Sequence, residues 1–123
     1  MSVSATVDGP WQSVLLDVLR AMHREGFAAR RTFDLQLARK SLRHGAREPR
    51  PHHGTARFTC QYLVLRVDGG GRSPGSLVFH GFERTTRVTL LPPVEGELEQ
   101  RLAAVVFEAL EHARAGAGGN DVA

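Results

Sequence analysis

Apolar side chains recur with helical spacing near both ends of the chain. In the first stretch they occupy positions i, i+3, i+4, i+7, i+8 and i+11, which form one face of an amphipathic helix; these residues are Trp11, Val14, Leu15, Val18, Leu19 and Met22. Pro10 suits the first position of this helix, and Gly26 suits a left-handed ending. A similar stripe predicts a last helix from about Val94 or Glu95 to Arg114.

A shorter helix is expected between these two. Its narrow apolar stripe consists of Leu35, Ala38 and Leu42. Asp34 is a suitable N-cap and Gly45 a suitable stop, so the helix would run from Asp34 or Leu35 to His44. Residues 27–33 before it are short and mixed in character, and we expect them to form an edge strand or a linker.

Three stretches are rich in β-branched and aromatic residues and predict strands. They are Phe58–Val67, Leu77–Phe82 and Arg87–Leu91. The first is apolar on both faces between Tyr62 and Leu65, which is typical of a central strand. The glycine-rich residues 69–75 form a hairpin loop between the first two strands, and residues 83–86 form a short turn before the third.

These elements predict a two-layer α+β domain with the order ααβββα. Consecutive strands with short connections form a three-stranded antiparallel meander, packed by two or three amphipathic helices. We expect a flexible N-terminus over residues 1–9, a single domain over residues 10–114 and a disordered tail over residues 115–123. The first and last helices would cover one face of the sheet. The other face would meet solvent or a partner.

The charge is divided unevenly along the chain. The formal net charge is +3, from 16 basic and 13 acidic residues. Residues 20–57 contain ten of the basic and three of the acidic residues, which leaves the rest of the chain acidic. All basic residues except Lys40 are arginines, whose planar donors suit phosphate and carboxylate, although GC-rich coding would give the same bias.

The basic segment 20–57 predicts an anionic partner, either an acidic protein or a nucleic acid. The expected partner-binding residues lie on the second helix and the loop that follows it; they are Arg39, Lys40, Arg43, Arg47 and Arg50. The alternative is that this segment packs beside the acidic last helix or is a solvated face. The strand aromatics are expected in the core rather than in a stacking surface, and they are Phe58, Tyr62, Phe79 and Phe82.

A cluster of histidines and one cysteine indicates a second candidate function, zinc binding. His52 and His53 precede Cys60 by a few residues, and His44 or His80 would supply a fourth ligand. Zinc takes four such nitrogen or sulfur ligands, or three and a water. Adjacent histidines do not easily bind one metal together, so the competing interpretation is a basic loop beside a buried Cys60 that acts as a small hydrophobe.

Catalysis is not expected. Cys60 with His53 or His80 as its base is the one nucleophile and base pair that the chain suggests, and Cys60 is in phase with Tyr62 in what we expect to be a packed layer. The glycine-rich loop joins two expected strands and lacks the lysine of a phosphate-binding loop. An enzyme of unknown chemistry therefore ranks third.

The expected setting is the cytoplasm. No apolar run approaches the roughly 20 residues that span a bilayer, and the first ten residues lack the features of a signal peptide. The single cysteine agrees with a reducing compartment. The sequence thus predicts a small cytoplasmic interaction module with no cofactor and no membrane partner, and an exposed sheet face or edge favours a homodimer.

Overall fold

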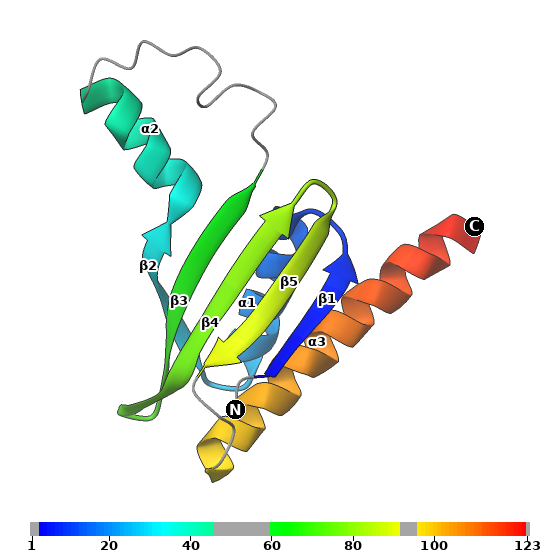
Figure 1. Ribbon diagram of the computed structural model, residues 1–123. Coiled ribbons are helices and arrows are strands. Elements are labelled where there is room, and N and C mark those ends of the chain that lie inside the picture. Colours follow the sequence, from blue (N-terminus) through cyan, green and yellow to red (C-terminus); the bar gives the residue numbers. More distant parts are fainter. Residues whose placement is uncertain (1–2, 46–59, 92–95, 123) are drawn as a thin grey trace.

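A five-stranded antiparallel sheet forms the centre of the structure, a computed structural model that describes residues 3–45, 60–91 and 96–122 (Figure 1). In chain order the elements are β1 (Val3–Asp8), α1 (Trp11–Arg24), β2 (Ala28–Asp34), α2 (Leu35–Gly45), β3 (Gln61–Gly69), β4 (Arg72–Phe82), β5 (Thr85–Leu91) and α3 (Glu97–Val122). Across the sheet the strands are ordered β1-β5-β4-β3-β2.

The predicted three-stranded meander with the order ααβββα is wrong in strand number and in element order. The α+β class is confirmed, and β3, β4 and β5 do form an antiparallel meander. However, β1 pairs with β5 and β2 pairs with β3, so two further strands form the edges of the sheet. In β1, Val3, Ala5 and Val7 alternate with polar residues over the stretch that we expected to be a flexible N-terminus.

Helix α1 connects the two edge strands and ends as its sequence predicts. Gly26 adopts a φ of +86°, which favours glycine. The N–H groups of Gly26 and Phe27 donate to the carbonyls of His23 and Met22, at 3.1 and 2.9 Å. This is the Schellman arrangement, which satisfies carbonyls at the end of the helix and turns the chain into β2.

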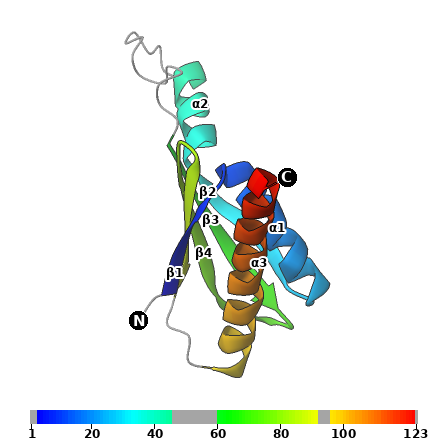
Figure 2. The same cartoon turned by 90° about the vertical axis from the view of Figure 1, so that its right-hand side faces the viewer.

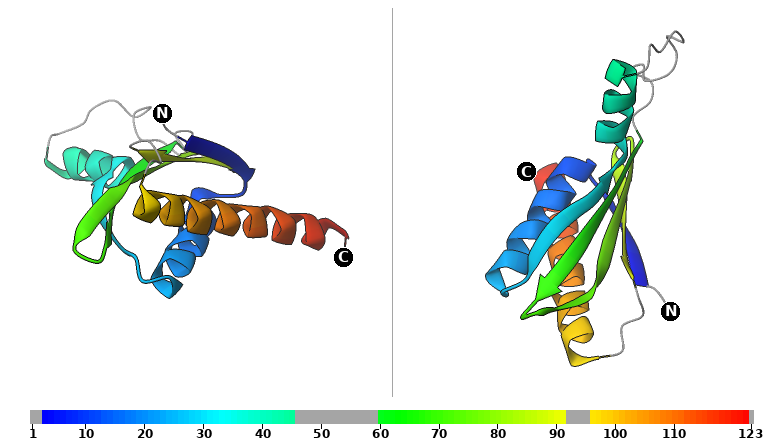
Figure 3. Two further views of the ribbon diagram at one scale, coloured as in Figure 1. Left: turned by 90° about the horizontal axis from the view of Figure 1, so that it is seen from below. Right: turned by 90° about the vertical axis from the view of Figure 1, so that its left-hand side faces the viewer.

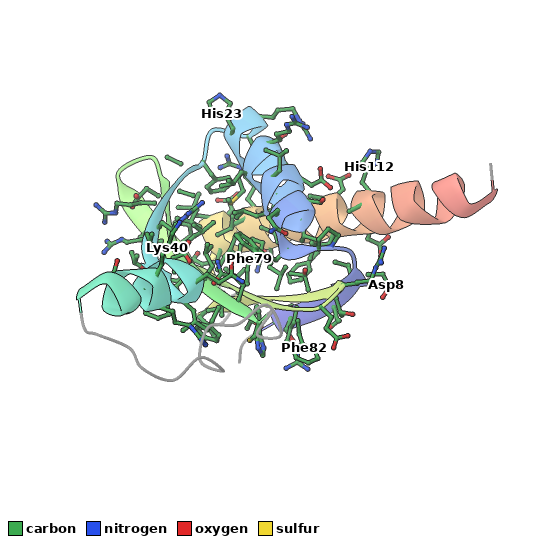
Figure 4. The ribbon with its side chains drawn as sticks, turned by 90° about the horizontal axis from the view of Figure 1, so that it is seen from above. Asp8, His23, Lys40, Phe79, Phe82 and His112 are labelled. Atoms are coloured by element: carbon green, nitrogen blue, oxygen red, sulfur yellow. The ribbon has the colours of Figure 1, made fainter. Side chains whose placement is uncertain are left out.

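Helices α1 and α3 lie on the same face of the sheet and bury the core against it (Figure 2). Phe79 of β4 is fully buried, and Figure 4 shows it between the sheet and the helices. The Arg101 side chain of α3 donates to the Glu25 carbonyl at 2.8 Å and lies 4.8 Å from the centre of the Phe27 ring. These two contacts join α3 to the end of α1.

Helix α3 extends from Glu97 to Val122, past the expected end at Arg114. Its apolar stripe faces the core through Leu102, Val106 and Leu110. In the described part of the chain, no helix combines the length and the apolar character that crossing a bilayer requires.

The start of α1 approaches β4 closely at Gly81. A Cβ atom added to Gly81 would lie 2.7 Å from the Cβ of Trp11 and 3.0 Å from its indole ring. Real side chains do not come this close, so the absence of a side chain at residue 81 sets how near the helical layer packs to the sheet.

Replacing Gly81 by alanine is expected to lower the free energy of unfolding by about 1–3 kcal/mol, because the new methyl group overpacks the contact with Trp11. Urea unfolding followed by circular dichroism measures this change. Ser76→Ala is the matched control, since Ser76 is half-buried on the opposite side of the same strand. We expect it to change stability by less than about 0.5 kcal/mol. Equal stabilities of the two variants would contradict this packing.

Candidate binding surface

The sheet face opposite α1 and α3, here called the open face, is covered by no helix of the described residues (Figures 2 and 3). Strand register shows which side chains share this face, because residues paired across antiparallel strands point to the same side. Tyr62 pairs with His80, and His80 pairs with Arg87. Figure 4 shows Phe82 on the side of the sheet away from the helices.

The open face exposes large apolar side chains. The exposed fractions are 42% for Phe33, 41% for Tyr62 and 57% for Phe82. Val64 and Val78 pair with each other on the two central strands of this face, where Val64 is half-buried and Val78 is buried. An antiparallel sheet that meets water on one side usually presents polar residues there, so this face is unusually apolar.

A β-bulge in β2 turns Phe33 onto the open face. Arg31 pairs with Leu65, whose side chain is in the core, but Phe33 pairs with Val64 on the open face, and the register shifts between the two. Thr32 is the extra residue of this bulge, since the register gives it no partner on β3. Without it, regular alternation would put Phe33 on the helix-covered face together with Arg31. Bulges often redirect a side chain in this way.

Three rings form a row across neighbouring strands. This aromatic row consists of Phe33 on β2, Tyr62 on β3 and His80 on β4. The Phe33 and Tyr62 ring centres are 6.3 Å apart in an edge-to-face arrangement, and those of Tyr62 and His80 are 5.8 Å apart. The row continues to Arg87, which pairs with His80 on β5.

Arginines lie beside the aromatic row. Arg30 is directly opposite Arg66 in the β2 and β3 register, an arrangement of like charges that is unfavourable without a counter-ion. The Nε atom of Arg66 is 3.8 Å from the Asp68 carboxylate. Within the described ranges, no carboxylate forms an ion pair with Arg30 or Arg87.

A buried polar network fixes the start of α2. The Asp34 Oδ1 atom accepts from the Leu37 N–H at 3.0 Å and from the Gln61 side-chain amide at 2.9 Å, which confirms Asp34 as the N-cap. Gln61 is fully buried, and its Oε1 atom accepts from the N–H groups of Gln36 and Tyr62, both at 3.0 Å. From this anchor α2 projects beyond the end of the sheet (Figure 3, right).

The predicted partner-binding residues lie partly on this projecting helix. Lys40 is exposed and Arg39 is half-buried on α2. Arg43 belongs to α2, but its side chain is outside the described part, and Arg47 and Arg50 lie outside the described residues altogether. Of the five predicted partner-binding residues, the structure therefore describes the side chains of Arg39 and Lys40, both on the helix that follows the edge strand β2.

The predicted zinc ligands are only partly within the described residues. His52 and His53 lie outside them, as does the side chain of His44. Cys60 and His80 do come together, with Sγ and Nε2 3.4 Å apart. A nitrogen and a sulfur ligand of one tetrahedral zinc would be about 3.6 Å apart. Among the described residues no group of three metal-binding side chains is present, so the zinc site stays a prediction.

The strand aromatics and Cys60 were expected in the core, and among the described ones only Phe79 lies there. Phe58 is outside the described residues, and Tyr62 and Phe82 are exposed on the open face. Cys60 is half-buried and contacts His80 of that face. Charged residues in phase with Tyr62 along β3 are the signal that could have identified this face as the outer one; they are Arg66 and Asp68.

The helical layer carries a different kind of surface. A cleft of about 540 Å³ lies between α1 and α3. Arg20 and Arg24 line it together with acidic groups that include Asp17 and Glu108. Because both signs of charge line this cleft, it is less suited to an anionic macromolecule than the open face is.

Comparison with known proteins gives no relative from which a role could be transferred. No protein-family model matches the chain, and neither a curated protein nor a solved structure matches it. The role of the chain is therefore inferred from the geometry of the open face and of α2.

Asp34→Ala is expected to destabilise the protein by about 1 kcal/mol through the lost helix cap, and by about 1–3 kcal/mol more because the buried Gln61 amide loses its acceptor. Chemical unfolding measures the sum. Asp34→Asn keeps an acceptor oxygen, so we expect it to lower the free energy of unfolding by less. Asp68→Ala, which removes a solvent-exposed carboxylate, is the control. An Asp34→Ala protein as stable as the Asp68→Ala protein would show that the network does not anchor α2.

Proposed function

We propose that the chain is a small cytoplasmic, non-catalytic binding module that holds an anionic partner on its open face and on the adjoining basic helix α2. The observation that supports this most directly is the exposure of Phe33, Tyr62 and Phe82 on one sheet face. Beside them lie Arg30 and Arg87, which form no ion pair with a carboxylate among the described residues.

The apolar part of the open face supports binding rather than simple solvation. Covering apolar surface contributes roughly 25 cal/mol per Å². Contiguous apolar patches with polar residues around them are typical of interaction sites. Here Val64 and Val78 occupy the centre of the patch, and Arg30, Arg66 and Arg87 lie around it.

The charge of β2 and α2 supports an anionic partner. Together these two elements contain five basic residues and one acidic residue. The acidic residue, Asp34, is engaged with Arg31 at 3.0 Å and with the α2 cap. Positive charge therefore continues from the open face onto α2, where a negatively charged chain lying on the sheet could follow it.

Reversing charge on the open face should weaken binding to a polyanion, with heparin as the probe. Arg30→Glu/Arg87→Glu is expected to elute from a heparin column at lower salt than the wild type. Arg20→Glu/Arg24→Glu changes the net charge by the same amount but alters the cleft between α1 and α3, and it should elute at higher salt than the open-face variant. Equal elution of the two variants would show that retention reflects net charge alone.

A further inference from the structure

We infer that the anionic partner is a single-stranded nucleic acid, whose bases stack on the aromatic row while its phosphates bind the neighbouring arginines. This inference rests on the proposed function, since it assigns a partner class to the same open face.

The aromatic row favours a nucleic acid over an acidic protein. An acidic polypeptide offers carboxylates, which the arginines alone would recognise. Every nucleobase also offers a planar π-face, and proteins that bind single strands combine a basic surface with aromatic side chains on which successive bases stack. Phe33 and Tyr62 are each about two-fifths exposed and lie on adjacent strands, so two successive bases could reach them.

The arrangement of basic groups fits a strand that runs across the sheet. The row that begins with Phe33, Tyr62 and His80 ends at Arg87 on β5. To one side of the row, Arg30 and Arg66 face each other on neighbouring strands. Arg66 already has the Asp68 carboxylate 3.8 Å from its Nε atom, whereas Arg30 forms no ion pair among the described residues. A phosphate beside Arg30 would supply the missing counter-ion, and guanidinium binds phosphate through paired hydrogen bonds.

The open face is better suited to a single strand than to a duplex. Bases in a duplex are stacked on one another, so their faces cannot reach rings on a sheet. Sequence-specific binding to single strands uses splayed bases that stack on aromatic side chains, as on the exposed sheets of known RNA-binding domains. A duplex would instead be read by an element that enters a groove, which the flat open face does not do.

Fluorescence anisotropy of the full chain with a labelled single-stranded oligonucleotide of about 12 nucleotides tests this inference. Tyr62→Ala and Phe33→Ala are each expected to weaken binding by about 5- to 160-fold, the range that corresponds to one lost stacking contact. Tyr62→Phe should retain near wild-type affinity. Leu16→Ala is the matched control, because Leu16 is similarly exposed, at 46%, but lies on α1. Circular dichroism confirms that each variant is folded.

The same titrations separate this inference from the proposed function. Affinity that falls steeply with salt, together with preference for the single strand over a duplex of equal length, supports the inference. Equal binding of duplex and single strand without an effect of Tyr62→Ala overturns it. Tighter binding to polyglutamate than to the oligonucleotide also overturns it, but leaves an anionic partner in place. A dimer that Tyr62→Ala dissociates, with no oligonucleotide bound, assigns the face to a second copy and overturns both.

Discussion

One-sided coverage of the sheet is the constraint on which the rest of the structure depends. A five-stranded sheet has two faces, and α1 and α3 both pack on the same one. The missing side chain at Gly81 lets Trp11 approach the sheet, and Arg101 links α3 to the end of α1. Because both helices pack on the core side of the sheet, the side chains of the opposite face determine what that face can bind.

Two local devices at the β2 edge then shape that face. The bulge turns Phe33 outward, where its ring meets Tyr62, and the Asp34 and Gln61 network begins α2 directly after the strand. The bulge and the hydrogen-bond network lie within a few residues of each other. They bring an aromatic side chain and a basic helix to the same edge of the open face, so the same local structure that stabilises this edge also positions its binding groups.

The sequence predicted the elements whose patterns are long and local. Helix α1 shows a periodic stripe and an ending at Gly26, and the strands of the β3–β5 meander are joined by short turns. The edge strands were missed or left open because β1 is short and only partly buried, and its pairing with β5 joins distant parts of the chain. Lys40 was correctly placed on an exposed helix. The aromatic row was not predicted, for two reasons. Alternation of side chains along a strand separates its two faces but does not show which face the helices cover. The outward position of Phe33 also depends on the bulge.

Tyr62 is the single tyrosine of the chain, so the solvent accessibility of its ring reports directly on the centre of the open face. Photochemically induced nuclear polarisation of the tyrosine ring measures this accessibility in solution. We predict a strong tyrosine signal from the free protein and its loss when a single-stranded oligonucleotide saturates the open face. No signal from the free protein, or a signal that saturating oligonucleotide leaves unchanged, would contradict an uncovered sheet face that binds nucleic acid.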